Sequence, residues 1–243
     1  MPNKKTPAFV LVPGASQNPA HYAHLLHLLQ SAGHGAFTGL LPSIGATAAI
    51  TATDDADYDV ILISHSSSGM PASAAALGLS PAERAAAGKS TSVLGQTFIA
   101  TSLPPGGDGL SVIDTFGGQL PPHMYIDGQQ NLLKCDDPNP PLFYDVEPAL
   151  ADAAVQTALS QGLTSFASPC PEASWNRDGF RDRVAYIHTL KDRALPYEAQ
   201  VAMVQGAGVE WITRDVDCGH SVQLSSAAEE LTRIVLEGAG LWV

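Results

Sequence analysis

The chain has 243 residues, a formal net charge of −12 at pH 7 and a hydrophobic fraction of 45%, which is ordinary for a packed globular protein. Lysine and arginine form no cluster, which argues against nucleic acid or an anionic membrane as a partner. No apolar run approaches the length of a membrane span, and the run at residues 8–12 is too short for the core of a signal peptide.

Apolar strand patterns alternate with helical patterns, which is typical of a mostly parallel sheet covered by helices on both faces. The predicted strands are residues 8–12, 60–63, 97–100, 184–188 and 210–214, and the predicted helices are residues 19–31, 69–77 and 226–236. The Thr-rich residues 41–58 barely suffice for a parallel crossover, so they predict a shortened helix or an irregular loop. A stretch missing from the chain between Leu41 and Tyr58 would give the same short connection.

Residues 103–171 differ from the rest because they are rich in Pro, Gly and Asp and show one helix, at residues 148–160, and no strand pattern. Aromatic and apolar residues are too frequent here for a disordered linker, which is the alternative. We expect a single domain in which residues 1–102 and 172–243 form the core. Residues 103–171 are expected to lie over the sheet as a lid and to build a substrate pocket.

The strand at residues 60–63 runs into a tight turn of small residues and then a helix. A serine on such a turn is exposed at the edge of a sheet, where hydrolases usually show Gly-x-Ser-x-Gly. Here Ser64 and Ser68 stand where the two glycines would be, with Ser66 between them.

Three consecutive serines compete for the role of nucleophile, and the turn requires small residues two places before and after it. Ser67 would have His65 at one of these places, and Ser68 would have Met70. Ser66 is therefore the best candidate. Considered alone, the run could equally be a serine-rich turn without chemistry.

A serine hydroxyl needs a base, which is usually a histidine oriented by a carboxylate. In a hydrolase of this kind the chain order is serine, acid, histidine. Asp192 and His220 each follow a predicted strand, and the carboxyl ends of parallel strands meet at one edge of a sheet. Asp215 and Asp217 are the rival acids, and Asp192 is preferred for its place in a strand-end turn.

Backbone N–H groups must also face the carbonyl oxygen as it gains charge. The residue after the nucleophile, Ser67, supplies one N–H, and the turn after the first strand should supply another, from Ala15. Gly14 permits the close approach of that turn. Pro-Gly after a strand is otherwise a plain turn signal.

The remaining histidines and cysteines predict no metal site. Three histidines of the first helix are spaced three apart rather than four, and the cysteines have no metal-like spacing, which favours reduced thiols in the cytoplasm. His188 is expected inside the core, whereas His123 could touch substrate. The histidines and cysteines in question are His21, His24, His27, Cys135, Cys170 and Cys218.

These features together resemble the α/β-hydrolase fold, and the chain is most similar to the small group of plant methyl-ester esterases and hydroxynitrile lyases with their bacterial and fungal relatives. The resemblance implies a mostly parallel sheet with helices on both faces and a small lid. The matching segments are Val10-Leu11-Val12-Pro13-Gly14-Ala15, His65-Ser66, residues 98–106, Lys191-Asp192-Arg193-Ala194-Leu195-Pro196 and Gly219-His220-Ser221.

The chain departs from this group at two places. Ser64 and Ser68 replace the usual glycines of the serine turn, and Ser221 stands where the hydroxynitrile lyases carry a lysine that handles cyanide. The second departure argues against cyanohydrin cleavage and favours ester hydrolysis.

We therefore predict a serine hydrolase that cleaves a small, largely apolar carboxylic ester or lactone through an acyl-enzyme on Ser66. The alternatives are lyase or cyclase chemistry on a natural product and a non-catalytic small-molecule receptor. No metal or cofactor is implied, and a homodimer remains open. The pocket is expected to include Ser16, Tyr125, Phe143, Tyr144, Phe166, Trp175 and Val222.

Overall fold

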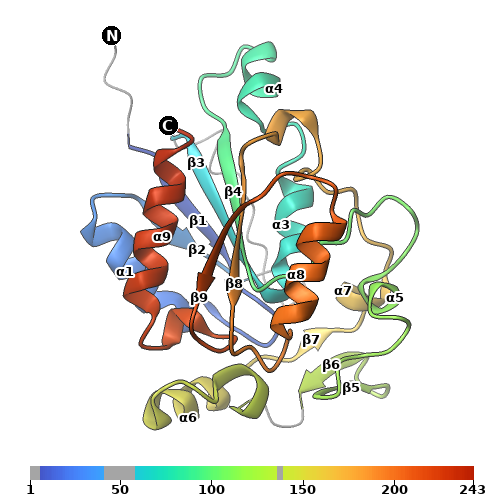
Figure 1. Ribbon diagram of the computed structural model, residues 1–243. Coiled ribbons are helices and arrows are strands. Elements are labelled where there is room, and N and C mark those ends of the chain that lie inside the picture. Colours follow the sequence, from blue (N-terminus) through green and yellow to red (C-terminus); the bar gives the residue numbers. More distant parts are fainter. Residues whose placement is uncertain (1–5, 41–57, 136–138) are drawn as a thin grey trace.

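The computed structural model describes residues 6–40, 58–135 and 139–243, and it contains a central parallel sheet of six strands in the order β2-β1-β3-β4-β8-β9 (Figure 1). Both the predicted α/β class and the predicted parallel sheet are confirmed. The six strands are β1 (Ala8–Val12), β2 (Ala36–Thr38), β3 (Val60–His65), β4 (Val93–Ile99), β8 (Val184–Thr189) and β9 (Ile212–Val216).

Side chains that alternate along the strands build two cores, one on each face of the sheet. Ile61 and Ile63 of β3 pack in the cluster that contains the apolar faces of α1 (Ala23–Ser31) and α9 (Ala228–Gly240). Leu62 faces the opposite way and packs with α3 (Gly69–Ala75) and α8 (Tyr197–Gly206). Burial on both faces explains why β3 reads as a continuous apolar run.

The structure corrects several predicted boundaries. Strand β4 begins four residues before the predicted start, β3 extends two residues further, and β2 and the helices α4 (Pro81–Ala86) and α8 were not predicted. Strand β2 has only three residues, which is too short for a periodic signal. The prediction for residues 41–58 falls almost wholly on residues 41–57, which lie outside the described residues.

Residues 103–171, called the insert below, connect β4 to β8. They contain α5 (Val112–Thr115), α6 (Pro148–Gln156), α7 (Thr164–Ala167), a π-helical turn at Asn139–Phe143, and an antiparallel sheet of β5 (Met124–Asp127), β6 (Leu132–Cys135) and β7 (Gln161–Gly162). The prediction of no strand here was wrong. These strands have two to four residues, so no alternation of burial is legible in the sequence.

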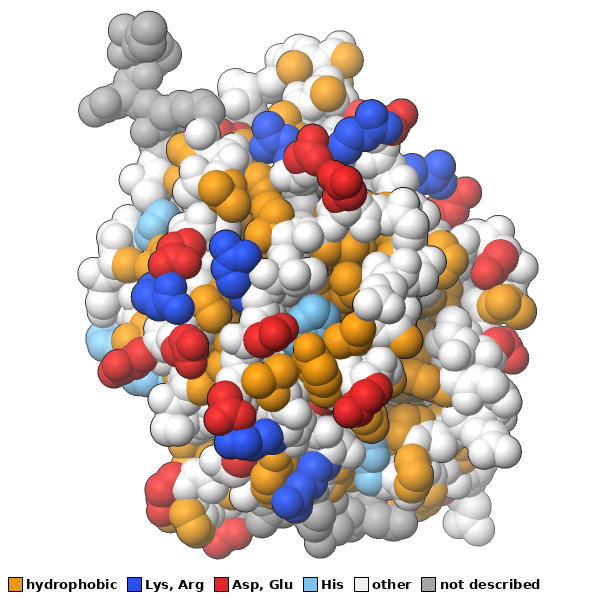
Figure 2. Space-filling model, in the orientation of Figure 1, with side chains coloured by type: hydrophobic (Ala, Val, Ile, Leu, Met, Phe, Trp, Pro, Cys, Tyr) orange, Lys and Arg blue, Asp and Glu red, His pale blue; other side chains and the backbone are white. Residues whose placement is uncertain are grey.

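The face drawn in Figure 2 carries acidic and basic side chains dispersed among apolar ones, with most basic side chains beside an acidic one. Exposed ion pairs in the described chain include Lys191 with Asp217 and Arg233 with Glu237. Exposed pairs of this kind contribute little to stability. Within the described residues, no helix combines the length and the apolar character needed to cross a bilayer.

The C-terminal Trp242 packs against the backbone of β4. A Cβ atom added to Gly95 would lie 2.2 Å from the Trp242 ring, whereas one added to Gly238 of α9 would meet nothing within 4 Å. We therefore expect Gly95→Ala to lower the free energy of unfolding by about 1–3 kcal/mol through overpacking. Gly238→Ala should leave it unchanged or raise it slightly, since alanine favours a helix. Urea unfolding of both variants measures the difference, and equal stabilities would contradict this packing.

Candidate active site

Ser66 occupies the sharp turn between β3 and α3, with a backbone φ of 58°, in the left-handed region. A non-glycine residue in this conformation is strained and is held by its surroundings. The surroundings are tight, because a Cβ on Gly14 would lie 2.7 Å from the Ser66 Cβ and a Cβ on Gly69 would lie 2.1 Å from the Thr101 Oγ1. The turn therefore lifts Ser66 out of the sheet, and it tolerates no side chain at its two neighbouring glycines.

Ser68 does more than replace a glycine of this turn. Its hydroxyl accepts a hydrogen bond from the His65 N–H (2.9 Å) and lies 2.7 Å from the Val12 carbonyl and 2.8 Å from the His65 carbonyl, to which it donates. The hydroxyl thus ties the serine turn to the end of β1. Ser64 is also buried, and its hydroxyl makes only a long contact of 3.5 Å with the Thr97 carbonyl.

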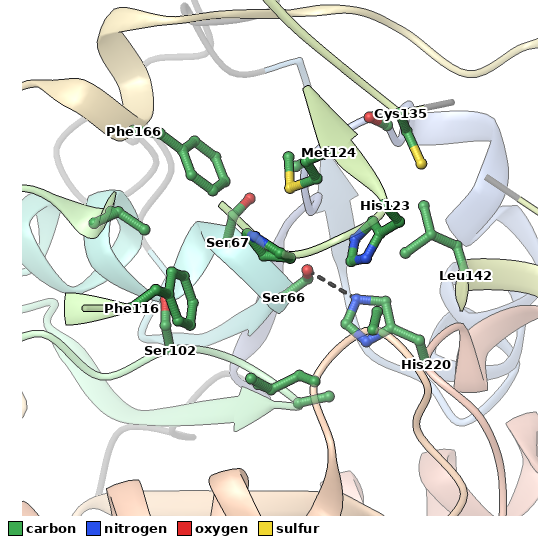
Figure 3. A pocket seen from close by; sticks show the side chains of 17 residues that line it. Ser66, Ser67, Ser102, Phe116, His123, Met124, Cys135, Leu142, Phe166 and His220 are labelled. Atoms are coloured by element: carbon green, nitrogen blue, oxygen red, sulfur yellow. Dashed lines mark hydrogen bonds between the residues drawn. The ribbon is translucent and has the colours of Figure 1, made fainter. Parts of the chain in front are cut away.

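Ser66, His220 and Asp192 form a continuous chain of hydrogen bonds, of which Figure 3 shows the Ser66–His220 pair. The Ser66 Oγ lies 2.8 Å from the His220 Nε2, and the His220 Nδ1 lies 2.7 Å from the Asp192 Oδ2. Because an ionised carboxylate only accepts, the Nδ1 carries the proton and the Nε2 is free to accept the serine proton. The three predicted residues therefore meet at the carboxyl edge of the sheet, in a geometry that can activate a hydroxyl.

The Asp192 carboxylate is completely enclosed and fully hydrogen-bonded. Besides His220 it accepts from the Thr189 hydroxyl and from the backbone N–H groups of Ala194 and Leu195, each at 2.8 Å. Burial opposes ionisation, but the charge of His220 and these hydrogen bonds outweigh it and lower the pKa of Asp192 below its ordinary value. The carboxylate is therefore a fixed negative charge beside the imidazole.

The two rival acids are engaged elsewhere. Asp215 contacts His188 at 2.9 Å, and Asp217 forms an exposed ion pair with Lys191 at 2.8 Å. His188 is buried, as the sequence predicted, and takes no part in the Ser66 arrangement. Asp192 is the acid that the fold brings to His220.

A second set of buried hydrogen bonds joins the loops behind Ser66. The His65 Nε2 lies 2.8 Å from the His220 carbonyl oxygen, which only accepts, so the His65 proton is on Nε2. The Tyr22 hydroxyl contacts the His65 Nδ1 (2.8 Å), accepts from the Gly14 N–H (3.0 Å) and donates to the Gln17 Oε1. This chain fixes the turn after β1, the serine turn and the histidine loop relative to one another.

Burial and the neighbouring charge of His220 lower the pKa of His65 to about 3, so its ring is neutral when the protein is folded. Gln17 also connects the turn after β1 to the segment that follows His220. Its amide donates to the Ser221 hydroxyl (2.9 Å) and accepts from the Gln223 amide (3.2 Å). All of these side chains are shielded from water.

The insert holds the acid and histidine loops from the outside. The Tyr144 hydroxyl donates to the Lys191 carbonyl, and the Arg193 guanidinium lies 3.6 Å from the centre of the Tyr144 ring. The Asp145 carboxylate accepts from the Gly219 N–H, directly before His220. Consecutive residues of the insert therefore bind both loops that carry the partners of Ser66.

A narrow cavity of about 60 Å³ opens beside Ser66. Among the described residues, its lining carries no Asp, Glu, Lys or Arg side chain and is mostly apolar, with Ser66, His220 and His123 as its main polar groups. Of the predicted residues, Ala15, Ser16, Ser67 and Phe166 belong to the lining, as does His123, which the sequence offered as a possible substrate contact. The sequence did not predict the remaining members, which are Ala100, Ser102, Val112, Phe116, Pro121, Met124, Cys135, Leu142, Ala194 and Leu195.

Five residues predicted for the pocket lie elsewhere. Phe143 and Val222 are fully buried in the cores of the insert and of the α1–α9 face, respectively. Trp175 packs in the core of the other face, with its ring tilted against that of Trp211. Tyr144 of the insert contacts the acid loop through Lys191, and Tyr125 is exposed on β5. Aromatic composition identified the insert as a pocket wall, but only tertiary packing decides which aromatic rings turn inward.

The three histidines of the first helix do not meet. His21 is buried and lies 2.9 Å from the Thr157 hydroxyl, while His24 and His27 are exposed. Among residues 6–40, 58–135 and 139–243, no group of three or more His, Cys, Asp or Glu residues is placed to hold a metal ion.

Comparison with known proteins accords with this geometry. The sequence profile of the Alpha/beta hydrolase family matches residues 9–234. The chain belongs to this family. It is 27% identical over 256 residues to an alpha/beta hydrolase of Aspergillus novofumigatus, nvfD, over 96% of this chain and 97% of that protein.

Solved structures of other α/β-hydrolase proteins share the fold at low identity. Polyneuridine aldehyde esterase superposes with a TM-score of 0.72 at 19% identity, over 96% of this chain and 99% of that one. A pyrethroid hydrolase from Sphingobium faniae JZ-2 gives 0.72 at 18% identity, over 96% and 97%. Tomato methylketone synthase I, in complex with 2-tridecanone, gives 0.71 at 16% identity, over 98% and 100%.

The neutral state of His65 makes stability depend on pH. Because its pKa is about 3 when folded and near 6.5 when unfolded, the unfolded chain binds an extra proton below pH 6.5, and stability is lost as pH falls. We expect this residue to lower the free energy of unfolding by about 1.6 kcal/mol between about pH 6.5 and 5. His65→Gln should remove this part of the dependence in urea titrations, and exposed His27→Gln should not. Identical pH dependence in the wild type and His65→Gln would contradict the assignment.

Proposed function

We propose that this hydrolase-family protein is a serine esterase that cleaves a small, uncharged carboxylic ester or lactone through an acyl-enzyme on Ser66. The observation that carries the proposal is the Ser66–His220–Asp192 chain of hydrogen bonds at the wall of an apolar cavity. Each of the three lies after a strand of the sheet, so the fold holds them without substrate. This arrangement suits acyl transfer to a serine.

In the proposed reaction His220 takes the proton of Ser66 as the hydroxyl oxygen attacks the ester carbonyl. His220 then gives this proton to the leaving alkoxide, which departs as the alcohol. Asp192 keeps the imidazole oriented and stabilises its positive charge, since its own carboxylate stays ionised. A water molecule, deprotonated by His220, then releases the acyl group as the acid and regenerates Ser66.

The negative charge that develops on the carbonyl oxygen needs donors already in place. We assign this role to the backbone N–H groups of Ala15 and Ser67, which belong to residues that line the cavity beside Ser66. Both turns are held by the buried hydrogen bonds of Ser68 and Tyr22. Rigid donors of this kind lower the barrier because they need no reorientation during the reaction.

The insert serves in this proposal as a lid over the cavity. Val112, Phe116, Met124, Leu142 and Phe166 come from it and supply most of the apolar wall. The described part of this wall has no charged side chain, which disfavours carboxylate or ammonium substrates because a buried unpaired charge is costly. The names of polyneuridine aldehyde esterase and the pyrethroid hydrolase fit this substrate class.

We expect Ser66→Ala and Asp192→Asn each to lower kcat on short p-nitrophenyl esters by about 10⁴-fold or more, because one loses the nucleophile and the other its correctly oriented base. The matched control Ser31→Ala alters an exposed residue at the end of α1 and should retain wild-type kcat. Initial rates measure the effect. Retained activity in Ser66→Ala would refute the proposal.

A fluorophosphonate probe tests the nucleophile independently of substrate choice. The wild type should gain the mass of one phosphonyl group at Ser66, as read by intact and peptide mass spectrometry, and Ser66→Ala should gain none. A wild type that binds small ligands tightly but is not labelled would instead indicate a receptor. A labelled protein that converts substrates without net hydrolysis would indicate lyase or cyclase chemistry.

A further inference from the structure

The cavity wall includes a buried hydroxyl without a hydrogen-bond partner among the described residues and a half-buried imidazole. The Ser67 hydroxyl is shielded from water and accepts or donates no hydrogen bond. The imidazole of His123, which comes from the insert just before β5, is half-buried and also lines the cavity. Buried polar groups are nearly always satisfied, so the unpaired Ser67 hydroxyl requires an explanation.

The two groups lie on either side of the nucleophile. In Figure 3 the His123 ring stands beside the Ser66–His220 pair, and the Ser67 hydroxyl points toward Phe166 and Met124. Burial and the nearby His220 lower the pKa of His123, so its ring is neutral at neutral pH. A neutral imidazole offers one donor and one acceptor, and a hydroxyl offers both.

The polarity of the remaining lining residues limits which substituents a ligand could carry here. Apart from these groups and Ser66 with His220, the residues of the wall that the structure describes are apolar or small serines, and none of them is charged. A charged substituent would therefore be left unpaired, whereas a neutral oxygen could accept from Ser67 and interact with either nitrogen of His123. A substrate that carries only hydrocarbon at this place would leave the Ser67 hydroxyl and the His123 ring without hydrogen bonds, which disfavours it.

We propose that His123 and the Ser67 hydroxyl bind a second, neutral oxygen of the substrate, a hydroxyl or a carbonyl close to the scissile ester. The preferred substrates are then hydroxy-esters or oxo-esters rather than simple alkyl esters. This inference rests on the proposed esterase function. His123 acts as a specificity-determining residue, and Ser67 acts through its side chain in addition to its backbone N–H.

Three methyl esters of nearly equal shape test the inference: methyl 3-hydroxybutanoate, methyl 3-oxobutanoate and methyl 3-methylbutanoate. The wild type should show kcat/KM at least about tenfold higher for one or both oxygenated esters than for the 3-methyl ester, the gain expected of a matched hydrogen bond. Which of the two is favoured distinguishes a bound hydroxyl from a bound carbonyl.

Variants assign the preference to the two residues. His123→Leu and Ser67→Ala should each lower the ratio of kcat/KM, oxygenated to 3-methyl ester, by about five- to tenfold. His123→Gln keeps a donor and an acceptor and should retain part of the ratio. The matched control His24→Leu lies on the exposed face of α1 and should leave the ratio unchanged.

The outcomes separate this inference from the function on which it rests. Turnover of all three esters at similar kcat/KM, or an equal loss on all three in His123→Leu, overturns the inference and leaves the esterase proposal standing. Failure to hydrolyse any ester, together with no phosphonyl labelling of Ser66, overturns both.

Discussion

The site depends on one strained turn at which three loops meet. Ser66 adopts a left-handed conformation, and Gly14 approaches so closely that a methyl group would not fit between them. The hydrogen bonds from the Gly14 N–H through Tyr22 and His65 to the His220 carbonyl hold the three loops in this contact. Since all of these groups are buried, losing any one would leave a polar partner unsatisfied, and the network is therefore rigid.

The insert combines two physical tasks. Its polar residues Tyr144 and Asp145 bind the loops of Asp192 and His220, while its apolar residues close the cavity. A displacement of the insert would therefore affect both the shape of the pocket and the position of the histidine. Although the insert is rich in proline and glycine, its apolar side chains form buried clusters that also include residues of the core.

The fold class was predictable because the apolar runs of β1, β3, β4 and β8 are buried on both faces, and such runs are legible in sequence. The places of Ser66, Asp192 and His220 were predictable because each follows a strand, and parallel strands end at a common edge. The short strands of the insert and β2 were not predictable, since two to four residues show no period. Nor was the helix α8, whose apolar residues form no clear stripe.

By itself, the sequence determined the sheet, the chain order of serine, acid and histidine, and the small residues that permit a tight turn. Only the tertiary structure decided that Ser68 forms a hydrogen bond to the end of β1 and is not merely a small residue in place of glycine. It also decided that Trp175 and Val222 belong to the cores and that His123 enters the cavity. The reason is that strand periodicity and turn sterics are local properties, whereas the direction of a side chain in an irregular insert depends on contacts between residues far apart in the chain.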